Sequence, residues 1–303
     1  MNENDFRHLL NKELGKKCLI LGGSPSIKNI DFEKFDGIII SMGSIPVGLK
    51  EQRHVDYWIV ANSIFPLPDK HYKSLNEFID TTLVFASSVS NSIVSTDYNK
   101  IKKNLKIPWF EYDQRHFNGL DCNKQNDYRF DFDKPLNCCQ HKKNITIQEY
   151  LQEIYKRNSH YSTASTVAIH SLSMAIILGC KEIYIAGVDL PKYQRDYMRY
   201  GSTSRLKLIK LFLLGIYNGV KIVPLSMVLT SIFGSNKKAI YYPDLPVILQ
   251  DFEYLNNLCN SNGIKLFNLS PKSTLNKIYN FNHLDPKAFN NSLIILMALV
   301  QYI

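Results

Sequence analysis

The sequence predicts an α/β protein built on a doubly wound, mainly parallel sheet. Short, continuous apolar runs recur through the first part of the chain, and such runs are typical of buried parallel strands. A stretch with helical spacing and a further apolar run follow, and this run ends in Gly187-Val188-Asp189. Because open α/β sheets bind ligands at the carboxyl ends of their strands, this ending also indicates where a site would lie.

The first part of the chain is expected to supply four strands. They are predicted from the apolar runs at Lys17–Leu21, Gly37–Ser41, Val55–Ala61 and Thr82–Ser87. A glycine-containing turn, Gly22 to Ser26, follows the first run directly, and Asn62 stands at the carboxyl end of the third. Both features place polar groups where parallel strands end.

A change of composition between residues 99 and 143 predicts an inserted lid or irregular subdomain. This stretch is charged, aromatic and rich in asparagine, and it shows little periodicity. Long irregular segments inside compact domains often serve as substrate loops, with surface decoration as the alternative. We therefore expect a single domain over residues 1–303 that carries this insert.

The second part of the chain is expected to alternate helices and strands. Thr163–Leu178 has helical spacing and is stopped by a glycine, and Glu182–Ala186 is the next predicted strand. Gly219–Ser226 and Gly263–Ser270 resemble each other in pattern, which predicts two more helix–strand units. A doubly wound sheet explains this similarity with fewer assumptions than a repeat protein.

Charge and cysteine content narrow the class of partner. The chain has 36 basic and 27 acidic residues, a formal charge of +9, which favours anionic partners. No nucleic-acid signature is present, so no nucleic-acid partner is expected. Six cysteines without CxxC spacing predict a reducing compartment and no zinc site, with Cys18 and Cys180 as small core residues.

No segment of the sequence predicts export or a membrane span. Met1–Lys17 contains no apolar core of a signal peptide, and the apolar stretch Leu206–Phe233 is interrupted by lysines and a proline. The last apolar run, Leu293–Ile303, is shorter than the roughly 20 residues that a bilayer requires. We expect a cytoplasmic protein with a buried final element, and a membrane-surface anchor is the alternative.

The loop Gly22-Gly23-Ser24-Pro25-Ser26 is the first candidate site. Its glycines permit a tight turn and a close approach of the backbone to a ligand, and its serines add hydroxyl groups. We expect it to hold the phosphate end of a nucleotide, while a turn that needs glycine only for its backbone is the alternative. The loop is neither GxGxxG nor a P-loop, which disfavours NAD enzymes and P-loop kinases.

Two further segments could contact an anionic ligand. The predicted helix begins with Thr163, Ser165 and Thr166, whose hydroxyls accompany the positive end of the helix dipole. Asp189 is followed by Tyr193 and Tyr197, whose phenol groups could bind phosphate or sugar. Simple helix capping and aromatic packing are the respective alternatives.

The histidines are candidates for a general base. His170 lies within the apolar helix, which predicts a core histidine. His116, His141 and His160 have polar surroundings, and any of them could serve as the base, although none is paired with a carboxylate in the sequence. His160, together with Asp189, is taken as the catalytic candidate. No spacing of His, Cys and Asp specifies a metal site.

Three blocks, in this order, resemble a known family. They are Leu-Ile-Leu-Gly-Gly-Ser-Pro-Ser-Ile from residue 19, Leu-Gly-Cys-Lys-Glu-Ile-Tyr-Ile-Ala-Gly-Val-Asp from residue 178 and Leu-Phe-Asn-Leu-Ser-Pro-Lys-Ser-Thr-Leu from residue 266. The chain resembles the bacterial sialyltransferases of glycosyltransferase family 42 and the related 6-hydroxymethylpterin diphosphokinase MptE-like domains. The blocks cover roughly a quarter of the chain.

The sialyltransferase resemblance implies a Rossmann-like domain with a lid, a CMP-linked acidic sugar as donor and inverting transfer to a glycan. It implies that Gly22 and Ser24 to Ser26 line the nucleotide phosphate, that Asn62 faces the donor and that Tyr197 reaches the phosphate. Thr166 and its neighbours would hold the nucleotide or a carboxylate. The other binding residues expected from these blocks and loops are Gly23, Ser165, Gly187, Tyr193, Ser270, Lys272 and Ser273.

The MptE-like resemblance implies a different reaction, diphosphate transfer from ATP to a hydroxymethyl pterin with magnesium, and agrees somewhat better with Ser270-Pro271-Lys272-Ser273. A catalytically silent nucleotide-binding protein is a third alternative, because no histidine occurs between His170 and His283, where the sialyltransferases have their base.

The function expected first is a nucleotide-sugar-dependent glycosyltransferase of surface polysaccharide or lipooligosaccharide synthesis. It would have no tightly bound cofactor and would use a CMP-sugar as substrate. Its acceptor would be a glycan or lipid-linked glycan, and the charge of +9 is compatible with peripheral association at the inner membrane face.

Overall fold

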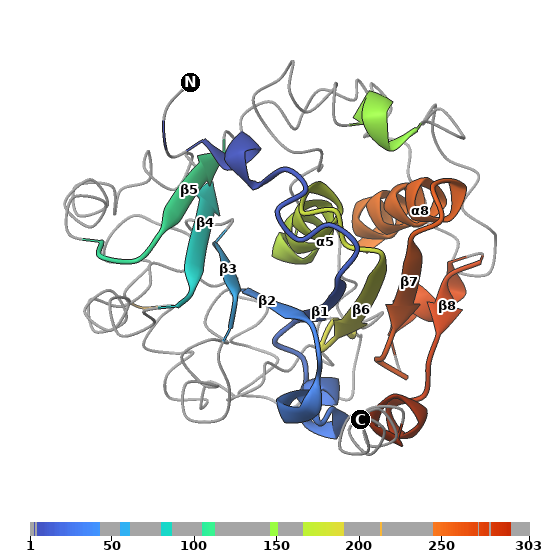
Figure 1. The fold of residues 1–303 in the computed structure, drawn as a ribbon. Helices are drawn as coiled ribbons and strands as arrows, with labels where there is room; N and C mark the ends of the chain where they lie inside the picture. Colours follow the sequence, from blue (N-terminus) through green and yellow to red (C-terminus); the bar gives the residue numbers. More distant parts are fainter. Residues whose placement is uncertain are drawn as a thin grey trace, which may run out of the picture.

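A parallel sheet of eight strands, in the order β5-β4-β3-β2-β1-β6-β7-β8, forms the centre of the molecule (Figure 1). The structure is a computed structural model that describes residues 3, 5–42, 55–60, 80–86, 105–112, 146–150, 166–190, 213, 245–271, 273–278 and 280–291. All seven strand pairs are parallel. The strands are β1 (Lys17–Leu21), β2 (Ile38–Met42), β3 (Tyr57–Val60), β4 (Thr82–Ala86), β5 (Trp109–Tyr112), β6 (Glu182–Ala186), β7 (Lys265–Asn268) and β8 (Asn282–His283).

The central strands are mostly apolar because both of their faces are covered. Leu19, Ile20 and Leu21 of β1 are all fully buried. Cys18 pairs with Ile38 of β2 on one side and with Ile183 of β6 on the other. Continuous apolar sequence is the pattern expected of such doubly covered parallel strands.

The strand order reverses between β1 and β6. From β1 the chain proceeds through β2, β3 and β4 to β5 on one side, and it then returns to β6 and proceeds through β7 to β8 on the other. The loops that follow β1 and β6 therefore depart in opposite directions from adjacent strand ends. Open α/β sheets bind ligands in the crevice that such a reversal creates.

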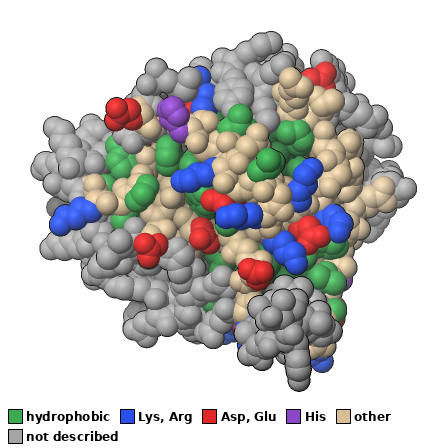
Figure 2. Space-filling view, in the orientation of Figure 1, with side chains coloured by type: hydrophobic (Ala, Val, Ile, Leu, Met, Phe, Trp, Pro, Cys, Tyr) green, Lys and Arg blue, Asp and Glu red, His purple; other side chains and the backbone are tan. Residues whose placement is uncertain are grey.

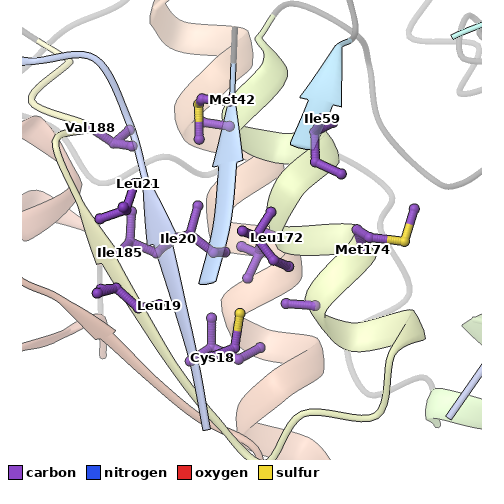
Figure 3. Packing of buried hydrophobic residues seen from close by; sticks show 14 of the residues in the cluster. Cys18, Leu19, Ile20, Leu21, Met42, Ile59, Leu172, Met174, Ile185 and Val188 are labelled. Carbon is purple, nitrogen blue, oxygen red and sulfur yellow. The ribbon is translucent and has the colours of Figure 1, made fainter. Parts of the chain in front are cut away.

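Two helices, α5 (Val167–Ile177) and α8 (Leu245–Ser261), lie side by side over one face of the sheet (Figure 1). Helix α5 covers β1, β2 and β3, whereas α8 packs on β7. In Figure 3 the side chain of Leu172 in α5 lies next to that of Ile20 in β1, and both are fully buried. Nearly every α5 side chain is buried, which explains why the helix is mostly apolar and contains no charged residue.

The direction of α5 places its first turn at the carboxyl edge of the sheet. Thr166 caps the helix, its side chain accepting a hydrogen bond from the backbone N–H of Ala168. At the other end Gly179 has a φ of +83°, the left-handed conformation that often terminates helices. Because the chain turns there and runs back as β6, the amino end of α5 lies at the carboxyl edge of the sheet.

The predicted α/β class and parallel sheet are confirmed. The observed strands β1 and β6 have the predicted bounds, and β2, β3 and β4 lie within two residues of theirs. Helix α8 followed by β7 confirms one of the two late helix–strand units. The other unit, at 219–226, lies outside the described residues, as do the apolar segments at 206–233, apart from Leu213, and at 293–303.

The expectation of irregular structure between residues 99 and 143 was wrong for one part of that segment. Trp109–Tyr112 form β5, the edge strand next to β4. An edge strand has one neighbour only, and Trp109 and Phe110 are only partly buried, so its sequence lacks the apolar continuity of β1. Most of the remaining segment lies outside the described residues. The two-residue strand β8 was also not predicted.

Burial confirms the assignment of Cys18 and Cys180 to the core. Both are fully buried free thiols, as is Cys259 in α8. Burial raises the pKa of the Cys18 thiol well above its usual value and that of Cys259 to about 12, so both stay protonated at neutral pH. They act as small hydrophobic residues.

Candidate functional site

The ends of β1 and β6 meet through two glycines. The N–H of Gly22 donates to the carbonyl of Ala186 (2.7 Å), and the N–H of Ser24 donates to the carbonyl of Gly187 (2.8 Å). A Cβ atom on either Gly22 or Gly187 would collide with the carbonyl oxygen of the other, and Gly187 has a φ of +69°. Both positions therefore require glycine for the close approach of the two backbones.

Asp189 joins the loop after β6 to the loop after β1. Its carboxylate accepts hydrogen bonds from the N–H (3.3 Å) and from the hydroxyl of Ser26, each to a different oxygen. Its own N–H donates to the hydroxyl oxygen of Ser24 (3.3 Å). Ser26 is the second residue of the short 3-10 helix η2 (Pro25–Asn29), so the carboxylate occupies the amino end of that helix.

The loop after β7 is the third part of the cluster. The hydroxyl groups of Ser26 and Ser270 lie 2.8 Å apart. Ser270 is fully buried, and the side chain of Asn268 holds it by accepting from its N–H (3.1 Å) and donating to its carbonyl (3.2 Å). The Asn268 amide also donates to the side chain of Asn276 (2.6 Å). These contacts leave Ser270 little freedom to move.

The same loop also fixes the backbone on both sides of Asp189. The hydroxyl of Ser273 donates to the carbonyl of Val188 (2.7 Å), and the N–H of Thr274 donates to the carbonyl of Asp189 (3.1 Å). The hydroxyl of Thr274 donates to the carbonyl of Leu190. Leu190 has a φ of +39°, an uncommon conformation for a residue with a side chain, and these bonds hold it there.

Some residues of the cluster are buried, and others are partly exposed to solvent. Ser24, Ser270 and Ser273 are buried, whereas Ser26 and Asp189 are half-buried. A ligand at the carboxyl ends of these strands could therefore contact Ser26 and Asp189, while the buried residues of the cluster hold these two in place. This arrangement is a rigid polar platform with one carboxylate at its exposed side.

The structure brings together most of the predicted site residues that it describes. Three separate predicted segments converge in the cluster, which contains Gly22, Ser24, Ser26, Gly187, Asp189, Ser270 and Ser273. Thr166 is half-buried at the same edge of the sheet, and no contact with the cluster is described for it. The predicted residues Asn62, His160, Ser165, Tyr193, Tyr197 and Lys272 lie outside the described residues, as does the side chain of Pro25.

Sequence reasoning missed Asn268, Thr274 and Asn276. Asn268 is fully buried as the last residue of β7, an unusual place for an amide. A polar residue that ends an apolar strand, two positions before Ser270, was the available signal. Its partner Asn276 could not be identified from the pattern, because it lies in the 3-10 helix η7 (Thr274–Lys277) on a different turn of the chain.

His170 is a core residue, as predicted. It is fully buried in α5, and burial lowers its pKa to about 3. It is therefore neutral at physiological pH, and its burial keeps it from contact with a ligand at the carboxyl ends of the strands. Among the described residues no group of three or more His, Cys, Asp or Glu side chains could hold a metal ion.

The charge of +9 does not gather into a single patch on the face shown in Figure 2. Lys and Arg side chains lie there interspersed with Asp and Glu side chains. In the parts of the chain that the structure describes, no helix has the length and apolar character needed to cross a membrane.

No protein-family model matches the chain, and no curated protein matches it. Solved structures with a similar fold include the sialyltransferase CstII from Campylobacter jejuni with CMP, at 15% identity and a TM-score of 0.43, over 90% of this chain and 86% of that one. CstII with the analogue CMP-3FNeuAc is 18% identical, with a TM-score of 0.41, over 89% of this chain and 86% of that one. The MAf glycosyltransferase from Magnetospirillum magneticum AMB-1 is 14% identical, with a TM-score of 0.47, over 94% of this chain but 38% of that one. Similarity at this level does not assign an activity.

Proposed function

We propose that the chain is a nucleotide-sugar-dependent glycosyltransferase whose donor binds at the carboxyl ends of β1, β6 and β7. One observation carries this proposal: at the strand-order reversal, three loops are joined around the half-exposed Asp189 through Ser26 and Ser270. The packing of the sheet does not require a polar cluster that joins three loops at this point, and open α/β sheets bind their ligands at such strand ends.

The donor class follows from the sequence blocks that form this cluster. The blocks around Gly22, Asp189 and Ser270 are those that resemble bacterial sialyltransferases, and they form the three loops of the site. We therefore propose a CMP-linked acidic sugar as donor and a glycan or lipid-linked glycan as acceptor, within surface glycan synthesis in the cytoplasm.

The proposed reaction is an inverting transfer. A hydroxyl oxygen of the acceptor attacks the anomeric carbon, the bond from that carbon to the CMP oxygen breaks, and the electron pair leaves with CMP. The proton of the acceptor hydroxyl passes to a base, for which His160 is the candidate. Asp189 orients the donor, and Ser165, Thr166, Tyr193 and Tyr197 are the candidates that stabilise the departing phosphate.

A thermal-shift panel tests the donor class. CMP, CDP, UDP, GDP and ATP are each compared with and without magnesium, because a ligand that binds only the folded state raises Tm by mass action. CMP is expected to stabilise the protein without metal, by about 2.7 kcal/mol at 100 times its Kd. A magnesium-dependent response to ATP alone would instead indicate a diphosphotransferase, and no response to any nucleotide would contradict the proposal.

Two variants that add the same charge locate the binding site. Ser26→Asp places a second carboxylate beside Asp189 and is expected to abolish the CMP response. Ser261→Asp adds that charge at an exposed position at the end of α8, at the opposite edge of the sheet, and is expected to leave the response intact. Release of CMP from a CMP-linked nonulosonic acid in the presence of oligosaccharide acceptors then tests transfer itself.

A further inference from the structure

The backbone donors of the loop after β1 are already used within the protein. The N–H groups of Gly22, Ser24 and Ser26 donate to Ala186, Gly187 and Asp189, and Pro25 has no N–H. Gly23 is the one loop residue for which the described chain provides no acceptor. A phosphate cradle needs several converging N–H groups, and this loop does not offer them.

The hydroxyl protons of Ser26 and Ser270 are committed as well. A serine hydroxyl has one proton, and that of Ser26 is donated to the Asp189 carboxylate. In the contact between Ser26 and Ser270 the donor is therefore Ser270. The hydroxyl of Ser270 therefore donates to that of Ser26, which donates to Asp189. Neither hydroxyl has a proton left for a ligand.

The platform still has capacity to accept hydrogen bonds. An ionised carboxylate can accept about four, and Ser26 supplies two to Asp189. Asp189 is half-buried, and within the described part of the chain no basic side chain pairs with its carboxylate. The exposed side of the platform therefore presents a negative charge with free lone pairs, which repels a phosphate and attracts O–H or N–H groups.

We infer that Asp189, positioned by Ser26 and Ser270, binds the ribose hydroxyls of the nucleotide and that the phosphate lies away from the Gly22–Ser26 loop. This assignment rests on the proposed function, since it takes the ligand to be a nucleotide. The ribose of a ribonucleotide carries two adjacent hydroxyls that can both donate to one carboxylate. The exocyclic amine of cytosine is the other donor of the CMP moiety, and the test separates the two.

The test measures the Kd of the full-length protein for CMP, 2′-deoxy-CMP, 3′-deoxy-CMP, UMP and pyrophosphate by calorimetry. Loss of a hydrogen bond to a charged group corresponds to about a 10- to 100-fold weaker Kd. The deoxy nucleotides are expected to show this loss, whereas UMP is expected to retain more affinity than either of them. These measurements use the wild-type protein and so do not depend on the folding of a variant.

Asp189→Asn is compared with Glu182→Gln, a change at the other end of β6 that removes the same charge. Asp189→Asn is expected to weaken CMP binding and to abolish most of the difference in Kd between CMP and its deoxy analogues, while Glu182→Gln changes neither.

Tighter binding of CMP or pyrophosphate by Asp189→Asn would overturn the inference, because the loop would then accept phosphate. Equal Kd values for CMP and both deoxy analogues would also overturn it, and a loss confined to UMP would place the base amine at Asp189. If CMP does not bind the wild-type protein at all, the proposed function fails and the inference fails with it.

Discussion

The carboxylate of Asp189 accepts hydrogen bonds from both the N–H and the hydroxyl of Ser26, a residue 163 positions away in the chain. This contact joins the loops after β1 and β6 at the point where the strand order reverses. Three predictions concern this contact and the segments around it, and a fourth concerns His170 in the core.

Ser26→Ala is expected to lower the free energy of unfolding by about 1–3 kcal/mol. The change removes the hydroxyl that donates to Asp189 and deprives the buried Ser270 hydroxyl of its acceptor, and an unsatisfied buried polar group costs about this much. Urea denaturation measures the loss. Ser261→Ala, at an exposed position, is the control and should change the free energy by less than about 0.5 kcal/mol. Equal effects of the two changes would show that the Ser26 contact contributes nothing.

Gly187→Ala and Gly263→Ala separate steric collision from backbone conformation. Both glycines have a φ of +69°, so both substitutions cost about 1–2 kcal/mol for the left-handed conformation. Only at Gly187 would the added Cβ also collide with the carbonyl oxygen of Gly22, whereas nothing lies within 4 Å of a Cβ at Gly263. Gly187→Ala is therefore expected to destabilise the protein more, and it should also weaken nucleotide binding. Similar unfolding free energies for the two variants would contradict the close contact between Gly22 and Gly187.

Thr274→Val and Thr274→Ser test the bond that fixes Leu190. Valine has nearly the shape of threonine but leaves the carbonyl of Leu190 without the Thr274 hydroxyl, and we expect a loss of about 1–3 kcal/mol. Serine retains the hydroxyl and should lose less stability than valine. Denaturation of the three proteins in parallel gives the comparison. A serine variant that is less stable than the valine variant would show that packing of the threonine methyl group, and not the hydrogen bond, holds this segment.

His170 is expected to make the protein less stable in mild acid. Burial lowers its pKa in the folded state to about 3, below the value of about 6.5 in an unfolded chain. Between these two values the unfolded state binds the extra proton, so stability falls as the pH falls from about 6.5 towards 3, by at most about 1.4 kcal/mol per pH unit.

The check for His170 is the pH dependence of unfolding. The free energy of unfolding of the wild-type protein and of His170→Gln is measured at pH 7, 6, 5 and 4. The variant should be less stable at pH 7 but should lose less stability between pH 6 and pH 4. Parallel curves for the two proteins would show that His170 does not titrate differently in the folded and unfolded states.

Much of the sheet could be predicted because burial determines sequence locally. The strands β1 and β6 have both faces covered, so their apolar runs mark their bounds without reference to the rest of the chain. The edge strand β5 was not predicted because it lacks such an apolar run. Trp109 and Phe110 are only partly buried, and their neighbours are polar. Helix α5 was predicted from its spacing, and its cap at Thr166 was among the hydroxyl residues named in advance.

The sequence by itself determined the α/β class, the positions of the central strands and the three segments whose polar residues follow those strands. Only the tertiary structure decided that β6 lies next to β1 and β7 next to β6, because strand order depends on contacts between residues far apart in the chain. That order brings Ser26, Asp189 and Ser270 within hydrogen-bonding distance, and it commits the N–H groups of Gly22, Ser24 and Ser26 and the hydroxyl of Ser26 to partners inside the protein. A pattern of glycines and serines shows that a loop can donate hydrogen bonds. The fold decides whether those donors remain available to a ligand, because a hydroxyl proton that is donated to one acceptor inside the protein is not available to another.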